Sequence, residues 1–306
     1  MAVRDFESPS SMAPHVTAGF AAAAGSQIHY LDTDPAGKAT ATALCLHGWM
    51  GSCGSFSPLL ERLPRDVRAI APDLPGFGCS GKPDVRYGME LYVRFVSDFA
   101  SALGLDSYTL VGASMGANIA VHYLAQDGGN VRSLIMVSPF GFRRSRGGIA
   151  RFAPIRPLMD TASLLATPAA VRRLLRRHAV LDPAVVTAGM VHAYSQSLGS
   201  REARRAMRRV LREIVVRTYM DDLLPFVAVP ATVIVGDHDR MVQELGLAVL
   251  RSALAHAQIA VVPDCGHMPI YERPDECCRL VASSVRGRSR RVDSRSIRYP
   301  PDPGSW

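Results

Sequence analysis

The feature that most constrains the fold is a series of short apolar segments, each leading into a turn and most followed by a segment with helical periodicity. Apolar cores such as LIMV and VIVG are typical of strands buried on both faces of a sheet. The strongest of these segments cover residues 41–47, 107–114, 131–138 and 231–237. Segments with helical spacing cover 89–103, 115–125, 242–254 and 274–285. Because strands that alternate with helices form a mostly parallel sheet covered on both faces, we predict an α/β fold.

Weaker signals complete the predicted order of elements. Residues 16–32 indicate a hairpin, and 67–71 and 258–264 indicate two further strands. About ninety residues separate the strand ending at Ser138 from the one that starts near Ala231, whereas an ordinary crossover needs only a dozen or more. We therefore predict a core of residues 16–140 and 227–285, interrupted by a helical insertion at 141–226. The composition of residues 1–15 and 286–306 predicts a disordered extension and a disordered basic tail.

The distribution of charge argues against a nucleic-acid partner. The net charge is +8, but sixteen arginines stand against six acidic residues between Gly141 and Val229, and six arginines against two aspartates from Val281 onward. The remainder of the chain is therefore net acidic, and no nucleic-acid-binding motif accompanies the arginines. We interpret the basic insertion as a solvated face. The alternative is an attraction to acidic substrates, a membrane surface or partner proteins.

Segment composition favours a cytoplasmic protein. The sequence contains no uninterrupted run of 18 apolar residues, so we predict no membrane-spanning helix. The first residues include acids, Ser and Pro where a signal peptide needs an apolar stretch. The cysteines have no spacing typical of zinc sites, so we predict reduced thiols that fill apolar space and no metal. They are Cys45, Cys53, Cys79, Cys265, Cys277 and Cys278.

The strongest chemical signal is the G-x-S-x-G motif at residues 112–116, between a predicted strand and a predicted helix. A serine on such a tight turn is lifted out of the sheet, and the small flanking residues permit the turn. We therefore predict that Ser114 is a nucleophile. The amide of Met115 would lie at a helix N-terminus, where it can stabilise developing negative charge.

A serine hydroxyl needs a neighbouring base, which in turn needs an orienting acid. His267 follows a predicted strand near the C-terminus and completes the chain order Ser, Asp, His. Two acids follow the preceding strand. We favour Asp239, and Asp237 is the alternative, which we interpret as a turn former bonded to its own backbone.

The tripeptide 47–49 follows the first buried strand and is expected to lie near the nucleophile. The Trp49 amide is the predicted second donor to an oxyanion, beside Met115. His47 is expected to hold this loop, and residues 73–80 to form a structural turn.

These motifs together resemble the α/β-hydrolase superfamily, in the order found in that family. They are HGW, DLPGFGCSGKP, GASMGA, GDHDR and GHMPIYERP, and they span residues 47–274. The resemblance is to the branch with carboxylesterases, meta-cleavage-product C–C hydrolases, epoxide hydrolases and haloalkane dehalogenases. Serine at the nucleophile position argues against the last two, which use aspartate.

The resemblance implies the triad Ser114, Asp239 and His267, with Trp49 and Met115 as the oxyanion hole. It also implies that the insertion 141–226 is a helical cap that shapes the substrate pocket. The expected activity is hydrolysis of an apolar carboxylic ester, thioester or lactone without a cofactor. C–C bond hydrolysis, a lyase or cyclase reaction, and a non-catalytic ligand-binding receptor are the alternatives.

Overall fold

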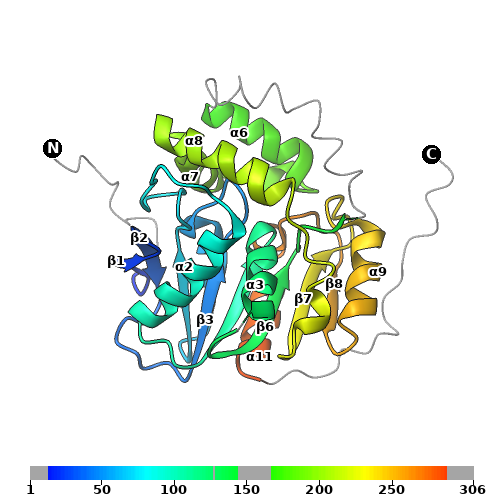
Figure 1. Cartoon of the computed structure of the whole chain (residues 1–306). Helices are drawn as coiled ribbons and strands as arrows, with labels where there is room; N and C mark the ends of the chain where they lie inside the picture. Colours follow the sequence, from blue (N-terminus) through cyan, green and yellow to red (C-terminus); the bar gives the residue numbers. More distant parts are fainter. Residues whose placement is uncertain (1–12, 127, 144–166, 288–306) are drawn as a thin grey trace.

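A computed structural model of the chain describes residues 13–126, 128–143 and 167–287. Its centre is an eight-stranded sheet in the order β1-β2-β4-β3-β5-β6-β7-β8 (Figure 1). The strands are β1 (Thr17–Ala23), β2 (Ser26–Asp32), β3 (Ala41–Leu46), β4 (Val67–Pro72), β5 (Tyr108–Ala113), β6 (Val131–Val137), β7 (Ala231–Gly236) and β8 (Gln258–Val262). The pairs β1/β2 and β2/β4 are antiparallel, and the other pairs are parallel. The predicted mostly parallel α/β fold is confirmed.

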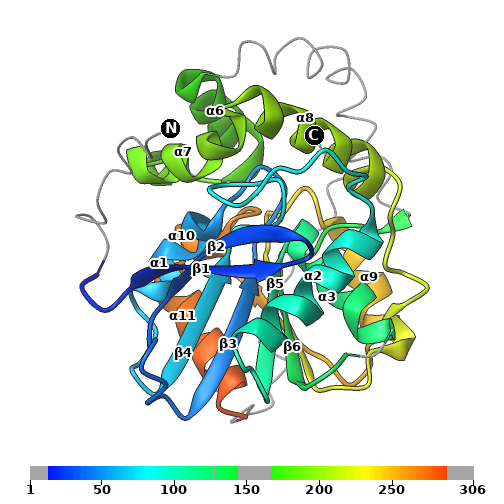
Figure 2. The same ribbon diagram turned by 60° about the vertical axis from the view of Figure 1, so that its left-hand side comes forward.

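Helices cover both faces of the sheet. On one face lie α2 (Met89–Ala102), α3 (Met115–Gln126) and α9 (Gln243–Ala253), and on the other lie α1 (Ser57–Leu60) and α11 (Pro274–Val285) (Figures 1 and 2). Each face has its own apolar core, because the central strands present buried side chains in both directions. The helix α2 buries Phe95 and Phe99 and ends before Gly104, whose φ of +61° is unfavourable for other residues.

Short helices that the sequence patterns did not predict adjoin these layers. They are η1 (Cys53–Phe56), α1 and α10 (Pro269–Glu272). The helix α10 begins two residues after His267, so it takes part in placing the histidine loop.

Between β6 and β7 the chain forms a helical segment, here residues 167–226, that lies over the ends of the strands next to Ser114 (Figures 1 and 2). It consists of α6 (Pro168–Leu174), η3 (Leu175–Ala179), η4 (Pro183–Val185), α7 (Ala188–Ser195), η5 (Gln196–Leu198), α8 (Arg201–Val210), η6 (Leu211–Val215) and η7 (Leu224–Phe226). The turns η3 and η6 are π-helical. Both contribute side chains to the pocket described below, in keeping with the frequent occurrence of π-turns at functional sites.

The helical segment is amphipathic. In α8 and η6, Ala203, Met207, Val210 and Ile214 are buried. The arginines of α8 are not all solvated, however. Arg205 and Arg209 form ion pairs with Asp84 at 3.1 Å and 2.5 Å, and Arg204 Nη1 donates to the Leu198 carbonyl at 2.7 Å. Part of the basic face therefore attaches the helical segment to the loop after β4.

Several predictions concern residues outside the described part of the chain. The predicted disordered extension falls there except for residues 13–15, which form a turn leading into β1. The predicted basic tail falls there except for 286–287, and 144–166 of the predicted insertion also lie outside it. Within the described ranges, no helix has both the length and the apolar character needed to cross a bilayer.

Candidate active site

Ser114 lies on a sharp turn between β5, which ends at Ala113, and α3, which begins at Met115. Its φ is +51°, a left-handed conformation that only a well-supported turn imposes on a non-glycine residue. The flanking glycines are required by close packing. A Cβ at Gly116 would lie 2.0 Å from the Leu46 carbonyl oxygen, and one at Gly112 would lie 2.5 Å from the Ala117 nitrogen. The motif therefore reflects how closely α3 approaches the two central strands.

The structure brings the three predicted residues together in one hydrogen-bonded chain. Ser114 Oγ lies 3.1 Å from His267 Nε2, and His267 Nδ1 lies 2.9 Å from both carboxylate oxygens of Asp239. Because Asp239 accepts at Nδ1, the neutral imidazole carries its proton there and presents Nε2 to the serine as an acceptor. The serine proton can therefore pass directly to the histidine.

Asp239 is buried, and its surroundings keep it ionised. Burial raises the pKa of this carboxyl, but the charge of His267 and hydrogen bonds from His267 and the Met241 amide outweigh burial, so the net pKa lies below the ordinary value. The Met241 and Val242 amides donate to Oδ1 at 2.9 Å and 3.2 Å. These bonds hold the carboxylate where it can accept from the imidazole.

Asp237, predicted to bond within its own turn, also holds a second loop. Its carboxylate accepts from the amides of Asp264 and Cys265 at 3.1 Å and 3.0 Å, and it lies 3.9 Å from His238 Nε2 of its own turn. These residues begin the loop that carries His267, so Asp237 ties that loop to the end of β7. A Cβ at Gly236 would lie 2.2 Å from the Cys265 carbonyl oxygen, which shows how close the two segments are.

The loop after β3 passes directly beside Ser114. A Cβ at Gly48 would lie 3.1 Å from the Ser114 Cβ. His47 is buried; its Nδ1 donates to the Gly48 carbonyl at 2.8 Å and its Nε2 accepts from the Leu74 amide at 3.0 Å. Burial lowers the pKa of His47 and outweighs the opposing effects of the Gly48 carbonyl and the charge of Asp73, so the neutral ring holds the loop. Because the peptide is trans, fixing the Gly48 carbonyl toward His47 leaves the Trp49 N–H on the opposite side.

Ser114, His267, Trp49 and Met115 line one cavity of about 170 Å³. Its wall is mainly apolar and comes from the core and from the helical segment. The core contributes Phe56, Val137, Phe140, Met241, Met268, Ile270 and Tyr271 among others, and the helical segment contributes Leu174, Leu175, His178, Ala179, Tyr194, Leu211, Val215 and Val216. Such a pocket suits an apolar group next to a few polar atoms. Its helical side could not be assigned from sequence, because the lining residues have no motif.

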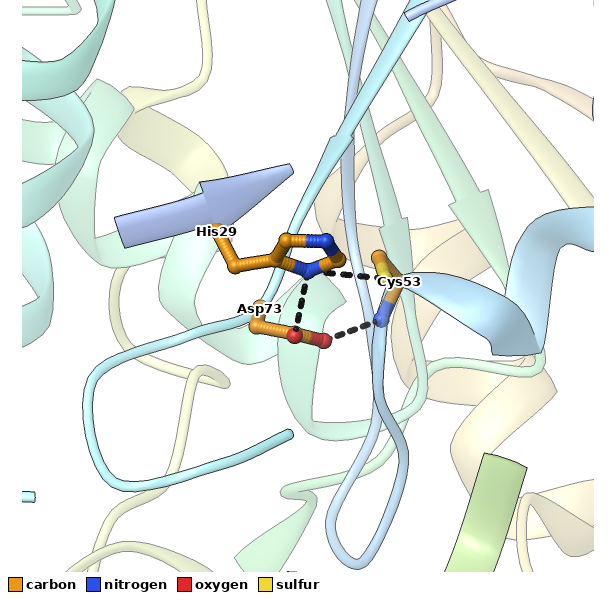
Figure 3. Close-up of side chains that lie close together, drawn as sticks. All are labelled: His29, Cys53 and Asp73. Carbon is orange, nitrogen blue, oxygen red and sulfur yellow. Dashed lines mark hydrogen bonds and ion pairs between the residues drawn. The ribbon is translucent and has the colours of Figure 1, made fainter. Parts of the chain in front are cut away.

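A second polar cluster lies away from this cavity, where β2, η1 and the end of β4 meet (Figure 3). His29 Nδ1 lies 2.9 Å from Asp73 Oδ2 and 3.6 Å from Cys53 Sγ. The Cys53 and Cys79 amides donate to the two Asp73 oxygens at 2.6 Å and 2.7 Å. Burial raises the pKa of Asp73, but His29 and these amides outweigh burial and lower the net pKa.

These three side chains are of types that bind metals. However, backbone amides and the imidazole already occupy both oxygens of Asp73, and burial raises the pKa of the Cys53 thiol well above its ordinary value. The cluster therefore acts as a clamp that holds the loop 73–80, in agreement with the predicted structural turn.

A family model described as the alpha/beta hydrolase family matches residues 43–280. The chain belongs to the alpha/beta hydrolase family. The match extends from β3 to α11 and therefore includes every residue of the cavity discussed above. The resemblance inferred from the motifs is confirmed.

The relatives of this alpha/beta hydrolase include two kinds of enzyme. The chain is 24% identical over 252 residues to monoacylglycerol lipase abhd6-A of Xenopus laevis, covering 79% of this chain and 74% of the lipase. It is 25% identical over 278 residues to 2-hydroxy-6-oxo-6-(2'-aminophenyl)hexa-2,4-dienoic acid hydrolase of Metapseudomonas resinovorans, covering 90% and 91%. Among solved structures, a bacterial membrane phospholipase A aligns with a TM-score of 0.75 at 24% identity over 89% and 86% of the chains. Family and relatives together indicate a hydrolase.

Proposed function

We propose that this chain is a serine hydrolase that cleaves a carboxylic ester, thioester or lactone of apolar character. The observation that carries the proposal is the hydrogen-bonded chain from Ser114 through His267 to the buried Asp239, at the wall of an apolar cavity. A serine linked to a base that an acid orients is the arrangement that nucleophilic acyl transfer needs.

The proposed reaction has two steps. In the first, Ser114 Oγ attacks the substrate carbonyl carbon while His267 Nε2 takes the hydroxyl proton, and His267 then gives that proton to the departing alcohol or thiol. In the second, His267 takes a proton from water, the resulting hydroxide attacks the acyl-serine, and the proton returns to Ser114. Asp239 stabilises the imidazolium in both steps, and no metal or organic cofactor is required.

We assign the backbone amides of Trp49 and Met115 as the hydrogen-bond donors to the oxyanion of each tetrahedral intermediate. Trp49 follows the loop that His47 holds against Ser114, and Met115 is the first residue of α3. The first amides of a helix have no partner within the helix and carry partial positive charge. Two such donors stabilise negative charge that appears only as the carbonyl is attacked.

The helical segment 167–226 is proposed to act as a cap. It supplies about a third of the residues that line the cavity and none of the five residues to which chemistry is assigned. It should therefore govern which acyl or alcohol groups fit, and leave the chemistry to the core.

Labelling with a fluorophosphonate, which reacts with activated serines, tests the assignment of Ser114. The wild type should be labelled and should hydrolyse chromogenic esters, whereas Ser114→Ala should fold normally, remain unlabelled and lose at least about a hundredfold in kcat. A Ser114→Ala variant that keeps its labelling or its turnover contradicts the proposal.

Hydrolysis of a C–C bond is the second candidate, and the relative from Metapseudomonas resinovorans, which aligns over 90% of this chain, favours it. A panel of esters of increasing chain length should be compared with a dienoate meta-cleavage product. Turnover of the dienoate with higher kcat/KM than any ester would assign the chain to the C–C hydrolases.

A further inference from the structure

We propose that Glu272 is a positioning residue that couples the helical segment to the loop carrying His267. The inference rests on the proposed function, because it assumes that His267 is the base. Glu272 is the last residue of α10, its exposed fraction is 5%, and it lies five positions after the histidine. It does not itself line the cavity, and its hydrogen bonds go to backbone amides of neighbouring segments, so any effect on chemistry must act through the loop.

One carboxylate oxygen of Glu272 holds the histidine loop on both sides of His267. Oε1 accepts from the Gly266 amide at 3.0 Å and from the Met268 amide at 3.2 Å. Backbone amides of the residues on either side of the histidine are therefore fixed to a single oxygen of a buried side chain. Since the direction of the imidazole depends on the backbone at His267, this oxygen helps to set the 3.1 Å separation of Nε2 and Ser114 Oγ.

The other oxygen reaches the helical segment. Oε2 accepts from the Leu181 amide at 2.6 Å, just beyond the π-helical turn η3. A second bond joins the same two segments directly, since the His267 amide donates to the Ala179 carbonyl at 2.9 Å. The packing is close, because a Cβ at Gly266 would lie 2.8 Å from the Leu181 nitrogen. Residues 179–181 therefore lie against the histidine loop, and Glu272 bridges them.

The chemistry of the site requires a carboxylate. Three amide N–H groups point at its two oxygens, and an ionised carboxylate is an acceptor at both. Glutamine has the same shape but only one oxygen. In either orientation its NH₂ group would face an amide N–H, at Leu181 or at Gly266 and Met268. One side of the bridge must then be lost, at a cost typical of unsatisfied buried donors.

The coupling implies that the histidine is correctly placed only while the helical segment is seated on the core. Displacement of about 1 Å in a catalytic group is enough to reduce rates a hundredfold. The reactivity of Ser114 should therefore depend on a hydrogen bond made by Leu181, which lies in the helical segment and does not line the cavity.

The test compares four variants by the second-order rate constant of fluorophosphonate labelling, well below each variant's Tm. Glu272→Gln loses one side of the bridge. Leu181→Pro removes the Leu181 N–H, and Val180 before it has φ −110° and ψ 155°, which suits a residue preceding proline. Leu181→Ala removes the same side chain but keeps the N–H. Glu90→Gln changes an exposed glutamate.

We expect Glu272→Gln and Leu181→Pro to be labelled at least about tenfold more slowly than the wild type, and Leu181→Ala and Glu90→Gln to stay within about twofold. A Glu272→Gln variant with a lower Tm but the wild-type labelling rate would overturn the positioning role. A Leu181→Pro variant that behaves like Leu181→Ala would overturn the coupling. Absence of labelling in the wild type would instead count against the proposed function.

If Leu181→Pro does not fold, amide hydrogen exchange measured on Glu272→Gln tests the coupling instead. In folded Glu272→Gln, amides in both 179–182 and 264–268 should exchange faster than in the wild type, because each segment loses support from the other. Faster exchange in only one of the two segments would overturn the coupling.

Discussion

At the scale of single residues, two aspartates in one turn have distinct roles because their carboxylates point to different partners. Asp239 contacts the imidazole of His267, whereas Asp237 contacts amides at the start of the histidine loop. Spacing past the end of the strand favours Asp239 and leaves Asp237 as the alternative. Substitution of Asp239 should mainly lower kcat, whereas substitution of Asp237 should mainly lower the free energy of unfolding.

Asp239→Asn should lower kcat by at least about a hundredfold, because an amide NH₂ facing His267 favours the wrong tautomer. Asp237→Asn should lower kcat by less than about tenfold and reduce the free energy of unfolding by about 1 kcal/mol through its loop hydrogen bonds. Steady-state kinetics and urea titrations of both variants measure these effects. Equal losses in kcat would contradict the assignment of Asp239, and the reverse order would point to Asp237 as the acid.

The buried Asp73 predicts a pH dependence of stability. Its pKa in the folded protein is below the ordinary value of about 3.9. The stability that ionised Asp73 contributes is therefore fully present above about pH 3.9 and is lost as the pH falls through the lower folded value. The difference in unfolding free energy between wild type and Asp73→Asn should be larger at pH 5.5 than at pH 3.

Urea titrations at the two pH values measure this difference. Asp106→Asn, a change at an exposed aspartate, is the control for the loss of one carboxylate. A difference between wild type and Asp73→Asn that stays constant from pH 5.5 to pH 3 would contradict the assigned shift.

At the scale of elements, the turn between β5 and α3 explains why the nucleophile motif has glycines. Gly116 allows α3 to lie against the carbonyl of Leu46 at the end of β3, the strand that leads into the Trp49 loop. The approach of α3 thus places the serine and the predicted oxyanion donors within one small volume.

Gly116→Ala should destabilise the protein by about 1–3 kcal/mol, because its Cβ would lie 2.0 Å from the Leu46 oxygen and α3 would have to move. Gly189→Ala in α7 is the matched control. The nearest atom to its Cβ would be Thr187 Oγ1 at 3.9 Å, so the change should be neutral or stabilising by up to about 1 kcal/mol. Thermal unfolding measures both. Equal Tm shifts would show that the contact at Gly116 relaxes easily.

At the scale of the whole molecule, the positive charge is concentrated in the helical segment beside the cavity. Arg205 and Arg209 pair with Asp84 and so help to attach this segment, whereas Arg173 and Arg176 are exposed. The exposed pair Arg173 and Arg176 can report on attraction to acidic substrates without disturbing that attachment.

We expect the double variant Arg173→Gln/Arg176→Gln to show the wild-type salt dependence of kcat/KM for both a neutral and an anionic ester. Exposed charges are screened beyond roughly 10 Å at about 0.1 M salt, and a solvated face contributes little to a reaction inside a cavity. A salt series from low to high ionic strength tests this. A shallower salt dependence for the anionic ester alone would show that these arginines steer acidic substrates.

The sequence by itself determined the parts of this protein that depend on local pattern. Apolar runs predicted the strands, helical spacing predicted α2, α3, α9 and α11, and the strand-turn-helix context predicted that Ser114 is a nucleophile, because each prediction rests on residues close together in the chain. The bounds agree to within one or two residues in most elements. The sequence also allowed His267 and Asp239 to be predicted as site residues. Each follows a strand of a parallel sheet, and the carboxyl ends of such strands meet at one edge.

Only the tertiary structure decided which groups touch. It separated Asp239 from Asp237, showed that arginines of α8 pair with Asp84, and joined Leu181 to Glu272 across 91 positions of sequence. Glu272 was present in the GHMPIYERP motif, but nothing in its spacing indicates which amides it accepts from. Such contacts depend on how helices and loops pack on the sheet, and distances between packed elements are not encoded in the periodicity of any one of them.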